Sequence, residues 1–146
     1  MTAPEYQAPD LNLLGESHIR AYRESNGEVG YLWNGVPTLL LTTTGRRSGQ
    51  PRTSALIFGR DGDDYLVVAS MGGAPAHPLW YENLLVDHRA EIQVQADHLT
   101  VQARTASADD KPRLWEIVRG VWPNYDVYQS RTARDIPVVI LSPRGE

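Results

Sequence analysis

Short runs of apolar and β-branched residues, separated by turn-forming residues, fill most of the sequence after residue 37. Each run has the length of an ordinary strand and is too short for a typical helix. The expected strands span residues 38–44, 52–58, 65–70, 91–95, 99–103 and 137–142. The tight turns at Arg60–Asp63 and Ala96–Asp97 are typical of β-hairpins. We therefore expect about six strands that pair mainly antiparallel.

Four other segments have helical patterns. Residues 11–25 place apolar side chains on one face, and Asn26-Gly27 is a typical helix stop. Residues 79–86 fit a short helix. A longer helix is expected to open at Ser107–Asp110 and to end before Pro123, with a short helix over 124–131. The pattern predicts an α+β domain, a small antiparallel β-barrel with flanking helices, over residues 11–146. Residues 1–10 are polar and are expected to be flexible.

Composition excludes several classes of function. The net charge of −4 argues against general nucleic-acid binding. No cysteine is present, so disulfides and thiolate metal sites are excluded, and no metal site is predicted. No apolar run approaches the ~20 residues of a membrane-spanning helix. The N-terminus lacks the pattern of a secretory signal. We expect a cytoplasmic protein.

The turn after the first expected strand, GRRSGQ, concentrates positive charge. Its two glycines allow a sharp turn that can direct backbone N–H groups toward an anion. Arg46, Arg47 and Arg52 add forked donors that suit phosphate or carboxylate groups. Nearby hydroxyl groups lie on Thr44, Ser48, Thr53 and Ser54. The segment alone fits an anion site or a solvated hairpin equally well.

Two further segments carry candidate binding groups. Residues 69–83 contain a Gly-Gly loop between a strand and a helix, which would let a flat ligand approach the backbone, although alone it reads as a connecting loop. His77 lies between prolines without a second ligand at metal spacing, so we interpret it as structural. In residues 122–131, Tyr125 and Tyr128 share one helix face. Such phenols either fill a core or donate hydrogen bonds to a substrate.

Taken together, LLTTTGRRSGQPR (40–52), VASMGGAPAHPLWYENL (68–84) and WPNYDVYQSRTARDIPVVI (122–140) resemble the deazaflavin-dependent nitroreductase family of split β-barrel oxidoreductases, found mainly in actinobacteria. The resemblance runs from residue 39 to residue 142. It implies coenzyme F420 as the cofactor, an 8-hydroxy-5-deazaflavin with a phosphate and an oligoglutamate tail. The implied cofactor-binding residues are Arg46, Arg47, Ser48, Arg52, Thr53, Ser54, Ala55, Leu56, Ile57, Val68, Ala69, Ser70, Met71, Leu79, Trp80, Tyr81, Glu82, Asn83 and Tyr125. The implied catalytic residues are Ser70, Tyr125 and Tyr128.

The resemblance also implies an activity. The reduced deazaflavin would transfer a hydride to a small electron-poor acceptor, such as a quinone, an activated enone or ester, or a nitroheteroaromatic. Two positions depart from the family pattern: Met71 replaces a frequent lysine, and Trp122 replaces a tyrosine found in several members. We expect the first to weaken one cofactor contact and the second to reshape the substrate pocket.

Three alternatives remain open at this stage. The chain could be an FMN-binding split-barrel oxidoreductase, which would use a similar phosphate grip. It could be a carrier that binds the cofactor without turnover. It could also contact membranes peripherally through its N-terminal helix to reach quinones, although that helix is weakly apolar. A closed barrel leaves no free sheet edge, so we expect a monomer or weak dimer.

Overall fold

Our computed structural model describes residues 15–144, which form four helices, one 3₁₀ turn and eight strands. The helices are α1 (Glu16–Ser25), α2 (Leu79–Val86), α3 (Lys111–Val121) and α4 (Asn124–Ser130), and the 3₁₀ turn is η1 (Met71–Gly73). The strands are β1 (Leu32–Trp33), β2 (Val36–Thr44), β3 (Pro51–Ile57), β4 (Gly59–Asp61), β5 (Asp64–Val68), β6 (Arg89–Val94), β7 (Asp97–Thr105) and β8 (Val138–Pro143).

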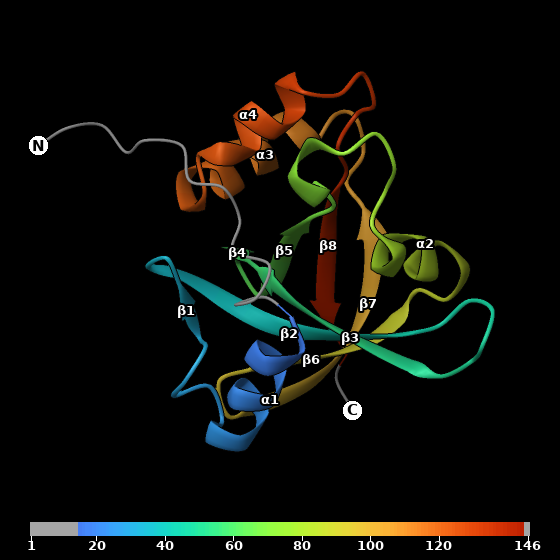
Figure 1. Ribbon diagram of the computed structural model, residues 1–146. Helices are drawn as coiled ribbons and strands as arrows, with labels where there is room; N and C mark the ends of the chain where they lie inside the picture. Colours follow the sequence, from blue (N-terminus) through green and yellow to red (C-terminus); the bar gives the residue numbers. More distant parts are fainter. Residues whose placement is uncertain (1–14, 145–146) are drawn as a thin grey trace, which may run out of the picture.

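All strand pairs are antiparallel, in the order β1-β2-β6-β7-β8-β5-β4, with β3 also paired to β2. The chain passes from β3 through Phe58 directly into β4, although these strands pair at opposite ends of that order. The sheet therefore curls into a half-barrel (Figure 1). Four helices flank it, which confirms the α+β, split-barrel expectation.

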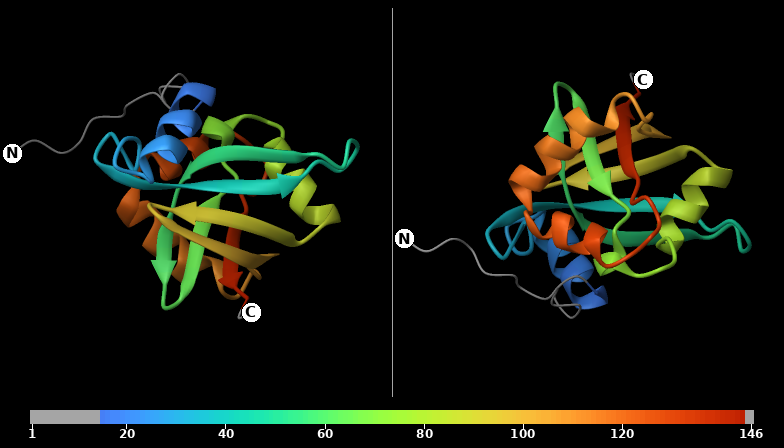
Figure 2. Two further views of the ribbon diagram at one scale, coloured as in Figure 1. Left: turned by 90° about the horizontal axis from the view of Figure 1, so that it is seen from below. Right: turned by 90° about the horizontal axis from the view of Figure 1, so that it is seen from above.

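The helices lie on different sides of the curled sheet. Helices α3 and α4 lie together on one side of the sheet and α1 lies on the opposite side (Figure 1). In Figure 2, α1 is therefore nearer the viewer from below, and α3 and α4 are nearer from above. Helix α2 lies beside the far end of the β2–β3 hairpin (Figure 1). Within residues 15–144, no helix is both long enough and apolar enough to cross a bilayer.

Alternation along the strands divides the apolar side chains between the barrel interior and the helices. Leu39 and Leu41 of β2 belong to the barrel core, whereas Leu40 packs with Tyr22 of α1. In β5, Val67 joins the barrel core, while its neighbours on either side pack against the α3–α4 side. The near-continuous apolarity of β5 thus reflects burial on both faces.

Helix α1 is fixed to the sheet by one buried phenol. The Tyr22 hydroxyl donates to the Thr38 carbonyl at 2.9 Å and accepts the Gln95 N–H at 2.8 Å. The helix ends at Asn26, which adopts a left-handed conformation with φ 53°, so the predicted stop is confirmed. The first four residues of the predicted helix, and the segment 1–10, lie outside the described residues.

Three features differ from the sequence-based expectation. Strands β1 and β4 were not predicted, because they are only two and three residues long and adjoin turn residues. Helix α3 begins at Lys111 rather than at Ser107. Ser107 instead caps the preceding turn, where its Oγ accepts the Asp110 N–H at 3.2 Å. Asp109 and Asp110 therefore precede the helix, whose first turn holds no acidic residue.

We expect Tyr22→Phe to lower the free energy of unfolding by about 1–3 kcal/mol, because the Thr38 carbonyl and the Gln95 amide both lose their partner. Urea unfolding followed by circular dichroism would measure the change. Tyr31→Phe is the matched control, because the Tyr31 hydroxyl has no hydrogen bond among residues 15–144. Equal losses in the two variants would show that the Tyr22 hydroxyl does not fix α1.

Candidate functional site

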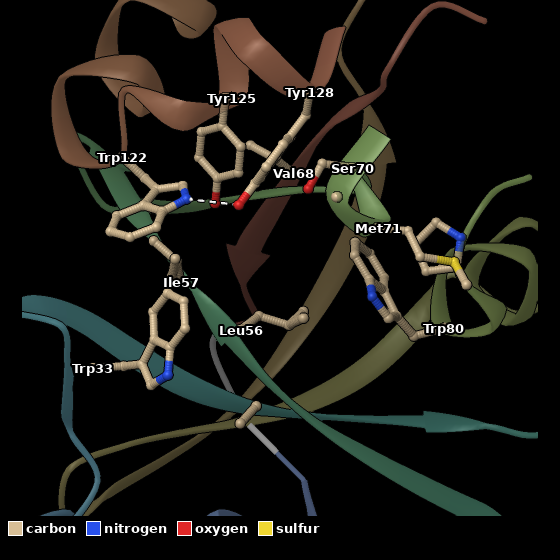
Figure 3. A pocket seen from close by; sticks show the side chains of 13 residues that line it. Trp33, Leu56, Ile57, Val68, Ser70, Met71, Trp80, Trp122, Tyr125 and Tyr128 are labelled. Carbon is tan, nitrogen blue, oxygen red and sulfur yellow. Dashed lines mark hydrogen bonds between the residues drawn. The ribbon is translucent and has the colours of Figure 1, made fainter. Parts of the chain in front are cut away.

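A cavity of about 500 Å³ lies between β1, β3, the end of β5, η1, the start of α2, Trp122 and helix α4 (Figure 3). Nine of the predicted site residues line it: Ala55, Leu56, Ile57, Val68, Ser70, Met71, Trp80, Tyr125 and Tyr128. Trp122 also lines the cavity, so it is in a position to shape the pocket, as the sequence analysis expected. Three lining residues were not predicted: Trp33, Gly72 and Pro78.

Flat aromatic side chains form opposite walls of this cavity. Trp33 and Trp122 pack together on one side, with ring centroids 5.1 Å apart and planes 52° apart. Trp80 and Met71 lie on the other side, and Leu56 of β3 lies between them (Figure 3). A slot with such walls accepts a flat, largely apolar ligand.

The hydroxyl groups of the cavity come from the loop after β5 and from α4. Ser70 is buried at the end of β5, beside η1. Tyr125 and Tyr128 lie on one face of α4, with ring centroids 6.0 Å apart. The Trp122 Nε1–H donates to the Tyr128 hydroxyl at 3.2 Å. These side chains can donate hydrogen bonds to an oxygen of a bound ligand.

Burial controls the protonation of Tyr125. Only 4% of the residue is exposed, and burial raises the pKa of its phenol well above the ordinary value, with the neighbouring Tyr128 adding to the effect. The anionic form is disfavoured where water is excluded. Tyr125 therefore keeps its proton throughout the physiological pH range and can donate a hydrogen bond.

Asp126 fixes the position of α4 from its outer side. Its carboxylate accepts hydrogen bonds from Trp115 Nε1 at 2.7 Å and from Arg119 Nε at 2.7 Å. The hydrogen bond from Arg119 lowers the pKa of Asp126, which opposes the smaller effect of burial. Helix α3 thus holds the first turn of α4. Helix α4 in turn places Tyr125 and Tyr128 in the wall of the cavity.

The arginine-rich hairpin between β2 and β3 is attached to α2. The Arg46 guanidinium lies 3.0 Å from the Glu82 carboxylate. The backbone N–H of Arg46 donates to Asn83 Oδ1 at 3.1 Å. Asn83 Nδ2 donates in turn to Thr43 Oγ1 at 3.1 Å. The side chains of Glu82 and Asn83, both implied by the resemblance to bind the cofactor, thus contact the hairpin.

The other two arginines of the hairpin region have no partner in the part of the chain that the structure describes. Arg47 and Arg52 are exposed, and neither forms an ion pair or hydrogen bond among residues 15–144. Arg52 lies opposite Thr43 in the β2–β3 register, so it shares the face of β3 that is turned toward Asn83 and α2. Leu56 lies on the same face, because residues two and four apart along a strand point the same way.

The remaining predicted site residues occupy other positions. Thr53 lies on the opposite face of β3, where its Oγ1 accepts a hydrogen bond from Arg23 of α1 at 2.7 Å. Ser48 Oγ accepts the Gln50 N–H at 3.1 Å within the turn. Ser54 lies on the same face of β3 as Arg52. Both Ala69 and Tyr81 are buried in the barrel core, whereas Leu79 is exposed on α2.

Trp33 was missed because nothing local marks it. It lies in the two-residue strand β1, and its burial depends on contact with Trp122, which is far away in sequence. The only signal was its position just before the Asn34-Gly35 turn, which predicts a hairpin but not the direction of the indole.

The buried phenol of Tyr125 predicts a stability loss in alkali. The unfolded chain releases this proton near the ordinary pKa of 10.0, and the folded chain holds it to a higher pH. The contribution to stability is therefore complete below about pH 10 and is lost above it, by up to about 1.4 kcal/mol per pH unit. Urea unfolding of wild type and Tyr125→Phe between about pH 9 and pH 11 should give the shallower pH dependence for the variant. Equal slopes would contradict this assignment.

Comparison with known proteins places this geometry in a family. The family model described as F420H(2)-dependent quinone reductase matches residues 15–143. An F420H(2)-dependent quinone reductase of Mycobacterium tuberculosis (strain ATCC 25618 / H37Rv) is 47% identical over 131 residues, which cover 87% of this chain and 88% of the relative.

Solved structures agree with the sequence comparison. An F420-H2 dependent reductase is 34% identical, with a TM-score of 0.68 over 73% of this chain and 94% of that one. A structure described as a domain-swapped dimer is 32% identical, with a TM-score of 0.71 over 87% of this chain and 95% of that one. These similarities confirm the deazaflavin-enzyme resemblance drawn from the motifs. By sequence and by fold, the chain belongs to the F420H(2)-dependent quinone reductase family.

Proposed function

We propose that this protein binds reduced coenzyme F420 and uses it to reduce a quinone. The observation that carries the proposal is the arrangement along one face of β3. Leu56 lies at one end of this face, in the aromatic-walled cavity, and Arg52 lies at the other, in the arginine-rich hairpin. A ligand with a flat ring and an anionic tail matches this division.

The residues present suit the cofactor. Its phosphate and glutamate groups need positively charged side chains that are not already paired with a carboxylate of the protein. Arg47 and Arg52 are such side chains among residues 15–144. Arg46 would contribute from the same hairpin, although Glu82 shares its charge. The ring would lie in the cavity against Leu56 and Trp80. The other predicted contacts, Ser48, Thr53, Ser54, Ala55, Ile57, Val68, Ala69, Ser70, Met71, Leu79, Tyr81, Asn83 and Tyr125, belong to this proposal.

The protein's own part in the reaction is to bind, orient and polarise. The bound deazaflavin would supply the hydride. Ser70, Tyr125 and Tyr128 would donate hydrogen bonds to the quinone oxygen that gains negative charge. Because burial keeps Tyr125 protonated, its phenol can act as a donor at neutral pH. The apolar walls exclude water, which strengthens these hydrogen bonds.

A quinone suits the cavity better than a highly charged acceptor. The walls are aromatic and aliphatic, and the polar side chains there are neutral hydroxyls and indoles. At the family's lysine position this chain carries Met71, an exposed and uncharged residue at the rim. An acceptor with a flat apolar ring and two carbonyl oxygens therefore leaves no charge unpaired on binding.

Binding measurements with three ligands test the cofactor assignment. We expect coenzyme F420 to bind more tightly than FMN in a fluorescence titration, and more weakly as salt increases. Arg52→Gln should raise the dissociation constant for coenzyme F420 by about 5- to 20-fold at low salt, because one charged contact is lost. The same variant should bind the deazaflavin riboside fragment, which lacks the phosphate and glutamates, as wild type does.

Arg20→Gln is the control, because Arg20 is exposed on α1, which packs on the other face of β3. Tighter binding of FMN than of coenzyme F420 would favour the flavin alternative. An equal loss for the riboside fragment would show that Arg52 does not contact the anionic tail. Tight binding of coenzyme F420 without turnover of any quinone would favour the carrier alternative.

The two tyrosines are expected to act on turnover rather than on cofactor binding. Replacing Tyr125 and Tyr128 together by Phe should lower kcat with menadione by about 10- to 100-fold, because the acceptor oxygen loses two of its three donors. The dissociation constant of coenzyme F420 should change less than about threefold, since a neutral phenol adds little to ring binding. Steady-state kinetics and the same titration measure both quantities. Unchanged kcat would remove the tyrosines from the mechanism.

Location and assembly remain predictions for this chain. The apolar side of α1 packs on the barrel through Tyr22, and the exposed residues include Glu16, Arg20 and Glu24. This charged surface gives little support to membrane contact through α1, which leaves the expected cytoplasmic location in place. A monomer or weak dimer remains a prediction, but the sheet is a half-barrel rather than the closed barrel on which that prediction was based, and one similar solved structure is described as a domain-swapped dimer.

A further inference from the structure

Arg134, in the loop between α4 and β8, binds the loop that carries Ser70. Its Nε donates to the Ala74 carbonyl at 2.8 Å, and its Nη2 donates to the Ser70 carbonyl at 2.8 Å. Its Nη1 donates to the Ala69 carbonyl at 3.1 Å and lies 3.0 Å from His77 Nδ1. One guanidinium thus joins both ends of the loop from residue 69 to residue 74.

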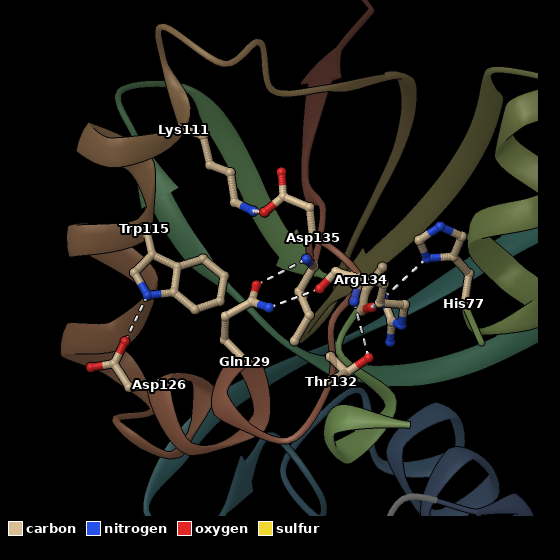
Figure 4. A network of polar contacts seen from close by, with 10 residues as sticks. His77, Lys111, Trp115, Asp126, Gln129, Thr132, Arg134 and Asp135 are labelled. Atoms are coloured by element: carbon tan, nitrogen blue, oxygen red, sulfur yellow. Dashed lines mark hydrogen bonds and ion pairs between the residues drawn. The ribbon is translucent and has the colours of Figure 1, made fainter. Parts of the chain in front are cut away.

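Among residues 15–144, this arginine has no carboxylate partner. The adjacent Asp135 instead pairs with Lys111 Nζ at 2.7 Å (Figure 4). Burial lowers the pKa of Arg134 from its ordinary value, but an arginine in a protein stays protonated. Its donors are therefore satisfied by carbonyl oxygens and an imidazole nitrogen. Only the planar, forked guanidinium can reach several such acceptors at once, so lysine is no equivalent here.

Helix α4 fixes the backbone from which Arg134 extends. Gln129 Nε2 donates to the Arg134 carbonyl at 2.8 Å, and Gln129 Oε1 accepts the Ile136 N–H at 3.0 Å. Gln129 follows Tyr128 directly on this helix. The contacts therefore run without a gap from the tyrosine helix through Gln129 and Arg134 to the Ser70 loop.

The loop also touches α4 directly, at Gly73. This glycine has φ +87°, and a Cβ there would lie 2.6 Å from the Tyr128 carbonyl oxygen and 3.0 Å from Arg131 Cβ. No other residue fits at this approach without moving the backbone. The loop is therefore held between the C-terminal end of α4 and the Arg134 side chain.

We propose that Arg134 is a positioning residue that sets the placement of Ser70 relative to Tyr125 and Tyr128. These donors come from two segments that are far apart in sequence, and Arg134 links the segments through side-chain hydrogen bonds. Gripping the Ala69 and Ser70 carbonyls also fixes the peptide planes on either side of Ser70, because a peptide unit is rigid. The catalytic meaning of this link rests on the proposed reductase function.

The test compares Arg134→Lys with Arg113→Lys. Arg113 is a matched control, because it forms a bidentate pair with Asp61 on the exposed side of α3. Hydrogen exchange followed by mass spectrometry, on protein without cofactor, should show faster exchange in the peptide that covers residues 69–78 only in Arg134→Lys. This readout does not depend on the reaction, so it remains decisive if the wild type fails to reduce menadione.

Kinetics then separate positioning from general stability. In Arg134→Lys we expect kcat with menadione to fall at least about tenfold, as misplaced donors would cause, while the dissociation constant of coenzyme F420 changes less than about threefold. Free guanidinium at low millimolar concentration should restore part of the lost turnover to Arg134→Ala and none to Arg113→Ala. Unchanged exchange in residues 69–78, or unchanged kcat in a folded Arg134→Lys, would overturn the proposal.

A second variant keeps the proposal open to test if Arg134→Lys does not fold. Gln129→Met keeps the length of the side chain and removes both of its hydrogen bonds to the Arg134 segment. We expect the same faster exchange in residues 69–78 and a smaller loss of kcat. Wild-type values for both quantities in Gln129→Met would overturn the link between α4 and the loop.

Discussion

The antiparallel register between β2 and β3 determines what each side of the molecule can do. Leu39 pairs with Leu56 and faces the barrel core, whereas Leu40 pairs with Ala55 and faces α1. At the hairpin end, the same register places Arg52 on the face turned toward α2. A slip of one residue would exchange the two faces, because side chains alternate along a strand. Core, cavity and charged hairpin are therefore set by one pairing.

This register also separates the chemistry of the site into two regions. Charge collects at the hairpin, where water can solvate Arg47 and Arg52 until an anion replaces it. The cavity keeps only neutral hydrogen-bonding groups, among them the buried Tyr125. In surroundings of low polarity, a neutral hydrogen-bond donor interacts strongly with negative charge that develops during the reaction. A free cation in the cavity would instead stabilise ligands that are already charged before the reaction. The division thus allows tight binding of an anionic cofactor beside a neutral acceptor.

The sequence predicts the parts of this arrangement that depend on local pattern. Alternation identifies the longer strands, and α2 has the predicted bounds, because each is specified by its own residues. Trp33 and Arg134 could not be predicted. Trp33 enters the cavity by packing on a distant indole, and Arg134 acts through backbone carbonyls, which every residue carries. Asn83 shows the same limit, since its contacts with the hairpin depend on how α2 lies beside it.

The effect of a tryptophan rather than a tyrosine at position 122 can be explained only from its hydrogen-bond partner, Tyr128. An indole N–H donates a hydrogen bond and cannot accept one, so the Tyr128 oxygen is the acceptor in this pair. A phenol that accepts a hydrogen bond becomes a stronger donor through its own O–H, because consecutive hydrogen bonds polarise one another. A tyrosine at position 122 could either donate or accept, which leaves the direction undefined. The tryptophan therefore fixes the polarity of the pair, and its contact with Trp33 fixes the position of the indole that does so.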